Sequence, residues 1–156
     1  MNQDFVINEL AIEKLEEALS LVLKVFIEFE APDYSPGGVR EFERFIEYSS
    51  IKQKLLGGQM KIWTCSDRDK VIGVLAVRPV CHICLFFVEG TYHRRGIARS
   101  MLGKMIEYYK EHDNSSEITV NSSPYAKEAY HKLGFFDTDE EQTVNGIRFI
   151  PMKRLL

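Results

Sequence analysis

The sequence predicts an α/β (α+β) fold, in which about four helices cover a mixed, mainly antiparallel sheet of about seven strands. Two observations lead to this prediction. Apolar runs of strand length are interspersed with segments whose apolar residues recur three and four positions apart, as on one face of a helix. Breaker-rich stretches separate these segments, and no linker, repeat or low-complexity segment divides the 156 residues, so we expect one domain, 1–156.

The N-terminal part of the chain is expected to form a strand, two helices and three strands. The spacing of apolar residues predicts one helix over 12–29 and a second over 39–56, which Gly57-Gly58 ends. Pro32, Pro36, Gly37 and Gly38 interrupt the helical pattern between them. The expected strands lie near 5–7, 59–65, 71–77 and 83–88.

The C-terminal part is expected to continue with a helix, a strand, another helix and two strands. A helix begins at Ile97, and a short strand follows over 117–121. Ser123-Pro124 is typical of a helix start, and Gly134 of a helix end. A strand begins near Phe135, and Asn145-Gly146 predicts a tight hairpin turn into the last strand.

Composition and charge exclude several classes of protein. An apolar content of 45%, a charged content of 28% and a net charge of −3 are ordinary for a soluble enzyme and argue against nucleic-acid binding. There is no apolar span of membrane length, and the N-terminus lacks the features of a signal peptide, so a cytoplasmic protein is expected. A local basic cluster suits a polyphosphate ligand: His93, Arg94, Arg95, Arg99 and Lys104.

Three cysteines include a C-x-x-C pair, Cys81 and Cys84, in addition to Cys65. Redox pairs of this kind lie at a helix start, and zinc sites need about four ligands. Here the pair lies at the entry to a strand, where residues three apart face opposite sides of the sheet. We therefore expect reduced, buried cysteines and no metal site.

The segment 83–102 combines a buried strand, a basic turn that contains Gly96, and the start of a helix. The free N–H groups of the first helical turn and the positive end of the helix dipole then point at one place. Such a place binds phosphates, and a glycine lets the phosphate approach the backbone closely.

This segment resembles the acyl-CoA-binding motif of the GNAT N-acetyltransferases, which reads Gln or Arg, two free positions, Gly, one free position, and Gly or Ala. The chain has His93-Arg94-Arg95-Gly96-Ile97-Ala98, with His93 at the position of the Gln or Arg. A second stretch, 120–135, is similar to the family's strand-helix segment that ends in Tyr, three residues, Gly, Phe. Ser123 stands there where many members have Asn. The resemblance implies the GNAT fold, with direct acetyl transfer from acetyl-CoA to a small-molecule amine, and a homodimer by family analogy.

The resemblance also implies which residues contact acetyl-CoA, the co-substrate. Backbone groups of Phe87 and Val88 would stabilise the negative charge on the carbonyl oxygen. The full set of implied cofactor-binding residues is Phe87, Val88, His93, Arg94, Arg95, Gly96, Ile97, Ala98, Arg99, Asn121, Ser123 and Tyr130.

Two residues are candidate catalytic groups. Tyr130 matches the family's general acid, although it also belongs to the apolar stripe of its helix. His82 falls where some members place a glutamate base, and a neutral histidine can accept a proton at pH 7. A structural histidine at a strand start is the alternative for His82.

The acceptor itself has no readable motif. The segment 28–34 falls where the family places its acceptor-binding loop, and its acidic residues could attract a cationic amine or simply form a solvated surface. A catalytically silent acyl-CoA-binding sensor is the alternative function. An ATP-binding domain is disfavoured because no G-K-[ST] follows the glycine.

Overall fold

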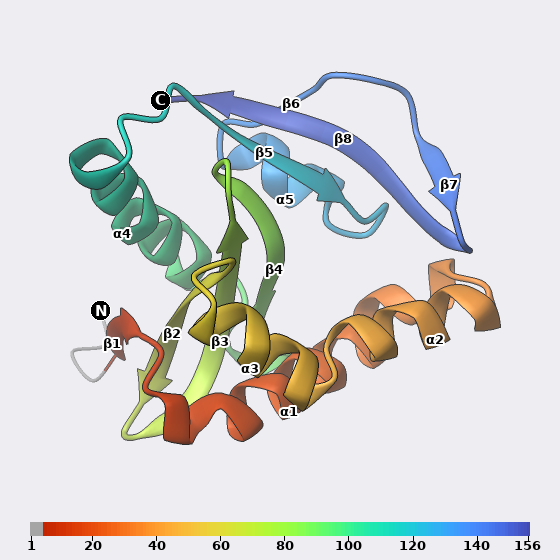
Figure 1. Cartoon of the computed structure of the whole chain (residues 1–156). Coiled ribbons are helices and arrows are strands. Elements are labelled where there is room, and N and C mark those ends of the chain that lie inside the picture. The colour runs from red at the N-terminus through yellow and green to blue at the C-terminus, as the bar shows by residue number, and fades with distance from the viewer. Residues whose placement is uncertain (1–4) are drawn as a thin grey trace.

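The structure, a computed structural model, describes residues 5–156. An eight-stranded sheet forms its centre in the order β1-β2-β3-β4-β5-β8-β6, with β7 paired to β8 beside this path (Figure 1). The strands are β1 (Phe5–Glu9), β2 (Lys61–Asp67), β3 (Lys70–Arg78), β4 (His82–Val88), β5 (Glu117–Ser122), β6 (Phe136–Asp137), β7 (Gln142–Val144) and β8 (Ile147–Leu155). The α-helices are α1 (Leu15–Val25), α2 (Pro36–Phe45), α3 (Tyr48–Leu56), α4 (Ile97–His112) and α5 (Lys127–Lys132). The predicted fold class is confirmed, because the sheet is antiparallel except where β4 pairs with β5.

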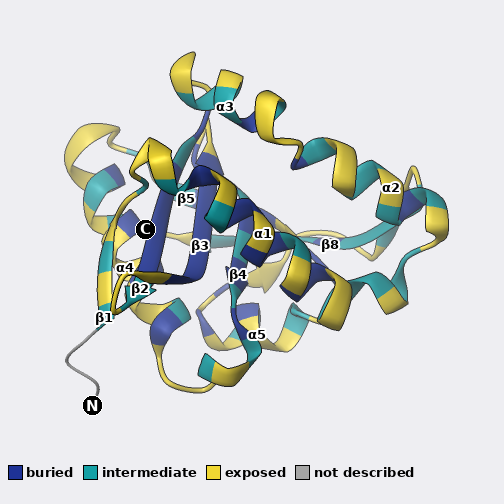
Figure 2. Cartoon of the chain, turned by 90° about the horizontal axis from the view of Figure 1, so that it is seen from below, coloured by how far each residue is buried: buried dark blue, intermediate teal, exposed yellow. Residues whose placement is uncertain are grey.

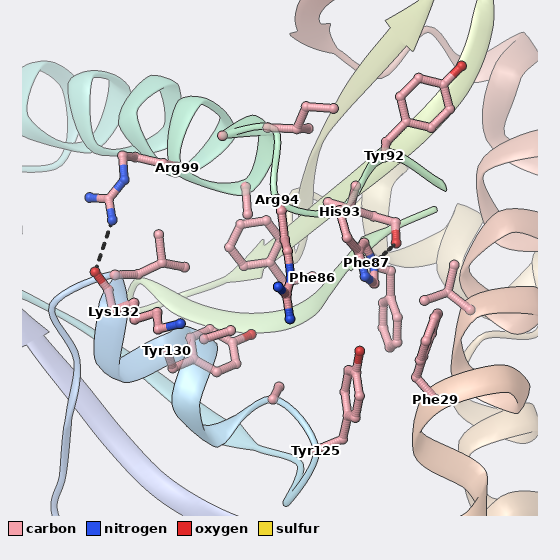
Figure 3. A pocket seen from close by; sticks show the side chains of 18 of the residues that line it. Phe29, Phe86, Phe87, Tyr92, His93, Arg94, Arg99, Tyr125, Tyr130 and Lys132 are labelled. Atoms are coloured by element: carbon pink, nitrogen blue, oxygen red, sulfur yellow. Dashed lines mark hydrogen bonds between the residues drawn. The ribbon is translucent and has the colours of Figure 1, made fainter. Parts of the chain in front are cut away.

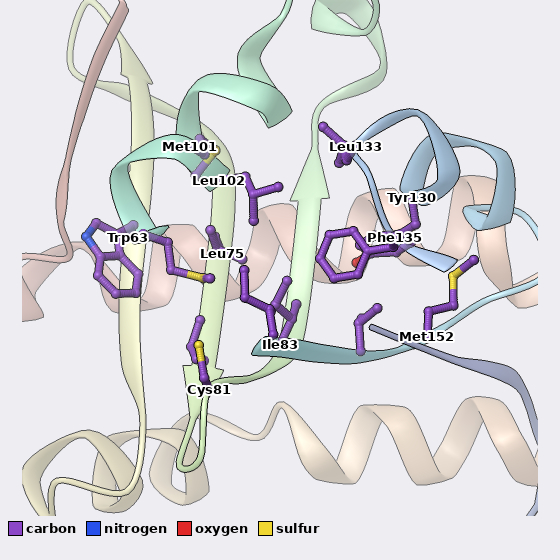
Figure 4. Close-up of a cluster of buried hydrophobic side chains, with 14 of the residues drawn as sticks. Trp63, Leu75, Cys81, Ile83, Met101, Leu102, Tyr130, Leu133, Phe135 and Met152 are labelled. Carbon is purple, nitrogen blue, oxygen red and sulfur yellow. The ribbon is translucent and has the colours of Figure 1, made fainter. Parts of the chain in front are cut away.

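Helices cover both faces of the sheet, and a hydrophobic cluster lies under each layer. On one face α4 and α5 pack over a cluster that contains Trp63, Leu75 and Met101 (Figure 4). On the other face α1 packs against β3 and β4, with Leu85 and Phe87 beneath it. β3 therefore has seven consecutive buried residues between two exposed ends, and it lies in the darkest, central part of Figure 2.

The two faces also separate the cysteines of the C-x-x-C pair. Cys81 belongs to the cluster under α4, whereas Cys84 packs against the cluster under α1. This confirms the predicted alternation along the strand entry. Cys65, Cys81 and Cys84 are all free thiols.

The predicted helix over 39–56 is wrong, because the chain forms two helices there. Glu47, with φ −56° and ψ 136°, leaves the helical conformation between α2 and α3. Ile46 and Ile51 are both buried in the cluster under α1. Five residues apart on one continuous helix, they would point about 140° away from each other. The break lets both side chains enter the same core.

Two local features of the C-terminal part also differ from the predictions in detail. Asn145 and Gly146 have φ values of 53° and 82°, so the predicted tight hairpin is confirmed. Its first strand, β7, was not predicted, because three polar and exposed residues carry too little hydrophobic pattern. The predicted helix at Ser123-Pro124 begins only at Lys127, although the Ala126 N–H does donate to the Ser123 hydroxyl, at 3.1 Å.

Candidate active site

The site lies where two neighbouring strands part. β4 and β5 are parallel and pair only at His82 with Thr119 and at Ile83 with Val120. Beyond Ile83 the two strands diverge, and β5 continues along β8 instead (Figure 1). The remainder of β4 therefore has an open edge toward α5, and parallel strands expose unpaired backbone groups at such an edge.

A first cavity of about 420 Å³ lies at this opening (Figure 3). The end of β4, the turn that follows it, the start of α4, the helix α5 and the end of the α1 segment all contribute to its walls. It is lined by Val25, Phe29, Glu30, Phe86, Phe87, Val88, Tyr92, His93, Arg94, Gly96, Ile97, Ala98, Arg99, Tyr125, Ala126, Ala129, Tyr130, Lys132 and Leu133. The walls are thus apolar toward α5 and β4, and basic at the start of α4.

The start of α4 has the geometry of an anion site. Gly96 is its N-cap in the left-handed conformation, with φ 78°, which glycine adopts without strain. The first intrahelical bond runs from the Ser100 N–H to the Gly96 carbonyl, at 3.0 Å. The N–H groups of the first helical turn before Ser100 therefore face the cavity side of the helix end. Arg94 and Arg99 line the same cavity and add positive charge.

Three side chains of the basic turn have different environments. The His93 Nε2–H donates to the Val88 carbonyl oxygen at 2.7 Å, so this histidine ties the turn to the end of β4 (Figure 3). Arg99 donates to the Lys132 carbonyl at 3.0 Å and thereby joins α4 to α5 (Figure 3). The Arg95 guanidinium lies 5.4 Å from the centre of the Tyr92 ring and does not line the cavity.

Tyr130 is buried on α5, at 7% exposure, and its ring packs edge-on against Phe135. Its hydroxyl points into the first cavity (Figure 3). Burial, followed by the charge of Glu30, raises the pKa of the Tyr130 hydroxyl above its ordinary value. The phenol therefore stays protonated and can donate a hydrogen bond throughout the physiological pH range.

Glu30 faces Tyr130 from the opposite side of the opening. It is the last residue of η2 (Phe26–Glu30), a π-helical segment that continues α1. π-Helical turns are rare and frequently mark functional sites. Burial raises the pKa of the Glu30 carboxyl to about 7, while a hydrogen bond with Ser123 opposes this and the nearby charge of Asp33 adds to it.

Our sequence analysis missed Glu30 as an individual residue, because it treated the whole acidic segment 28–34 as one loop. A usable signal was present. Val22 and Phe26 are buried, and Glu30 continues their four-residue spacing onto the inward face of the helix. A carboxylate in line with a buried stripe is a candidate functional group.

His82 lies at the other, closed end of the β4–β5 pair. Its Nδ1 is 2.7 Å from the Thr119 hydroxyl oxygen, across the last paired position before the strands diverge. Burial, followed by the charge of Arg78, lowers the pKa of His82 to about 4. His82 lines neither the first cavity nor the second cavity described below, so the structure does not bring it together with Tyr130.

The structure gathers most of the predicted cofactor-binding residues around the first cavity. These are Phe87, Val88, His93, Arg94, Gly96, Ile97, Ala98, Arg99 and Tyr130. Arg95, Asn121 and Ser123 do not line it, and the last two line the second cavity instead.

Comparison with known proteins agrees with this geometry. Residues 30–156 match the acetyltransferase (GNAT) domain family. The chain belongs to the GNAT acetyltransferase family. It is therefore an enzyme of the acyltransferase class. It is 31% identical over 111 residues to the uncharacterized N-acetyltransferase YafP of Escherichia coli, an alignment that covers 71% of this chain and 67% of that protein.

Solved structures share the fold of this GNAT protein. A GCN5-related N-acetyltransferase from Rhodopseudomonas palustris superposes with a TM-score of 0.84 at 15% identity, over 100% of this chain and 98% of the other. The PaiA N-acetyltransferase of Thermoplasma acidophilum, solved in complex with coenzyme A, superposes with a TM-score of 0.80 at 16% identity, over 100% of both chains.

Two searches of the described residues define what else the GNAT chain contains. Within 5–156, no helix has the length and hydrophobicity needed to cross a bilayer. No group of three or more histidine, cysteine, aspartate or glutamate side chains in this range is arranged to hold a metal ion.

Proposed function

We propose that this GNAT protein transfers the acetyl group of acetyl-CoA to the primary amine of a small acceptor by direct attack. The observation that supports this proposal is the meeting of two cavities at Glu30 and Tyr130, in the opening between β4 and β5. In the reaction a C–N bond forms between the amine nitrogen and the acetyl carbonyl carbon, and the C–S bond of the thioester breaks. The amine loses one proton, and the thiolate sulfur gains one.

The residues of the first cavity fit acetyl-CoA as the acyl donor. The phosphates would be held by the N–H groups at the start of α4, together with the guanidinium groups of Arg94 and Arg99. The apolar wall that Phe86, Ala126 and Leu133 contribute suits an extended, weakly polar arm. Main-chain N–H groups of Phe87 and Val88 are our candidates for binding the carbonyl oxygen, because both residues line this cavity.

We assign the role of proton acceptor to Glu30 rather than to His82. Glu30 lines both cavities, so an amine at their junction lies within its reach, whereas His82 is engaged with Thr119 at the closed end of the strands. A base works best when its pKa lies near the working pH. The pKa of about 7 meets this condition for Glu30, and the pKa of about 4 does not for His82.

We assign the role of hydrogen-bond donor to the leaving sulfur to Tyr130. The raised pKa makes its phenol a weaker acid than a thiol, which titrates near ~8.5, so complete proton transfer from the phenol is uphill. A hydrogen bond to the developing thiolate still lowers the barrier, because it is strongest when the charge is greatest.

The test compares three variants of the full chain. Calorimetry measures acetyl-CoA binding, and release of free thiol measures turnover with a panel of amines. We expect Glu30→Gln and Tyr130→Phe to bind acetyl-CoA as the parent does and to lose about 10²–10⁴ in kcat. Glu28→Gln is the matched control, because Glu28 is exposed and lines neither cavity, and its rate should not change.

Two results would contradict the proposal. Full activity of Glu30→Gln or Tyr130→Phe would remove that residue from the mechanism. Tight acetyl-CoA binding by the parent protein, without thiol release for any amine, would instead favour the acyl-CoA sensor.

A further inference from the structure

A second cavity, of about 250 Å³, lies behind the first, between α2 and the diverging strands. α2 runs beneath the β7–β8 hairpin, which closes this side of the molecule (Figure 1). The cavity is lined by Glu30, Tyr34, Glu41, Phe42, Phe45, Ile83, Cys84, Phe86, Phe87, Val120, Asn121, Ser123, Ala126, Tyr130 and Ile147.

The second cavity opens onto the reacting position. It shares five lining residues with the first cavity, namely Glu30, Phe86, Phe87, Ala126 and Tyr130. A ligand in the second cavity would therefore present one end to Glu30 and Tyr130. The shared residues lie at the open edge of β4, so the two ligands would meet end to end there.

The walls of this cavity form a preformed aromatic slot. Phe42 stacks on Phe26 with ring centres 3.9 Å apart, and it meets Phe87 edge-on at 5.9 Å. Tyr34 packs against the same Phe26 ring at 5.4 Å. Rings that hold one another in this way lose little conformational freedom when a ligand binds. A slot between flat rings suits a flat, apolar body.

The charges of the lining residues point to a single cation. Glu30 and Glu41 are the lining carboxylates, and Glu41 is already paired with Arg44 at 3.2 Å. None of the lining residues, all of them in the described part of the chain, is lysine or arginine. A ligand with a carboxylate would therefore lack a partner here, and a second ammonium group would be buried against Phe45 and Ile147. Both situations cost free energy.

The volume limits the size of the ligand. Drug-sized molecules occupy pockets of about 300–1,000 Å³, and this cavity is smaller. It accommodates one aromatic ring and a short linker rather than an oligosaccharide or a polypeptide.

We propose that the second cavity is the acceptor site and that it takes a small primary amine with one positive charge and a flat apolar body, of the phenylalkylamine class. This inference rests on the proposed acetyl transfer and specifies its acceptor. The ammonium group lies at Glu30, where it loses its proton on attack, and the ring lies between Phe42, Phe45 and Phe87.

The first arm of the test is a substrate panel at saturating acetyl-CoA, with free thiol as the readout. The panel contains 2-phenylethylamine, benzylamine, spermidine, phenylalanine and an aminoglycoside. We expect kcat/KM for 2-phenylethylamine to exceed that for spermidine or phenylalanine by at least ~100-fold, since the rejected compounds bury an unpaired charge. Best turnover of spermidine, phenylalanine or the aminoglycoside would overturn the inference and leave the proposed acetyl transfer intact.

The second arm changes the size of the slot. Phe45→Ala should lower kcat/KM for 2-phenylethylamine by about 10-fold or more and raise it for 2-(1-naphthyl)ethylamine, with acetyl-CoA binding unchanged. Ile147→Phe fills the slot and should lose 2-phenylethylamine turnover, which keeps the test valid if Phe45→Ala does not fold. Tyr48→Ala is the matched control, because this exposed aromatic residue lines neither cavity.

The outcomes separate the two proposals. If both slot variants keep the parent preference among amines, the second cavity is not the acceptor site. If the parent binds acetyl-CoA and acetylates no amine of the panel, the assigned acceptor class is wrong. If the parent does not bind acetyl-CoA at all, the proposed function itself fails.

Discussion

Replacement of Glu30 by Gln should make the protein more stable at alkaline pH while it removes activity. Burial raises the pKa of the Glu30 carboxyl from 4.5 to about 7. A carboxyl whose pKa is raised on folding contributes most stability below pH 4.5, and the contribution is lost as the pH rises through 7. Above that pH the native protein carries a buried carboxylate that the unfolded chain would solvate better.

The magnitude follows from the two pKa values. The difference between 4.5 and about 7, at ~1.4 kcal/mol per pH unit, sets an upper limit of ~3 kcal/mol for the loss between pH 4 and pH 9. Glu30 is only half-buried, so solvent reduces this, and we expect ~1–2 kcal/mol. A neutral glutamine of the same shape does not ionise and escapes the loss.

Urea denaturation of the parent, Glu30→Gln and Glu28→Gln at pH 5, 7 and 9 measures this effect. The stability of Glu30→Gln relative to the parent should rise steadily with pH, whereas Glu28→Gln should follow the parent at every pH. A gain in stability coupled to lost turnover is typical of a residue kept for function. If Glu30→Gln and the parent have parallel pH profiles, Glu30 does not titrate in the buried state that we describe.

Three further predictions concern the other parts of the site. His82→Asn should leave kcat unchanged but reduce acid sensitivity: the lowered pKa of about 4 means that stability present above pH 6.5 is lost as the pH falls through 4, which urea denaturation at pH 4–7 would show. Gly96→Ala should cost ~1–2 kcal/mol, since an alanine at φ 78° is strained although its Cβ meets nothing within 4 Å, and thermal unfolding with calorimetry of acetyl-CoA binding would check this. Arg94→Ala should raise KM for acetyl-CoA, reduce its salt dependence and leave kcat unchanged in steady-state kinetics; a lower kcat at saturating acetyl-CoA would mean that Arg94 acts in the chemical step.

The parts of the molecule that could be predicted from the sequence are those held by local interactions. The strand, the turn at Gly96 and the helix α4 are contiguous, and backbone conformation with hydrophobic periodicity determines each of them. The same holds for the hairpin at Asn145-Gly146. These segments also carried the family resemblance, so the fold class and most residues of the first cavity followed from them.

The break between α2 and α3 shows where the local pattern failed. Residues 39–56 have a continuous helical appearance, but the burial of Ile46 and Ile51 in one core requires a bend. No interaction within the segment demands it. The demand comes from the sheet against which both helices pack.

The sequence by itself therefore determined the fold, the anion site at Gly96 and the presence of Tyr130 in a GNAT-like helix. Only the tertiary structure decided which acidic or basic group faces that tyrosine. Glu30 reaches the site from a helix 100 positions away along the chain, whereas His82, next to the cavity strand in sequence, is turned to Thr119. The reason is that the site forms where β4 and β5 part, and the position of that parting depends on the packing of the whole sheet rather than on any one segment.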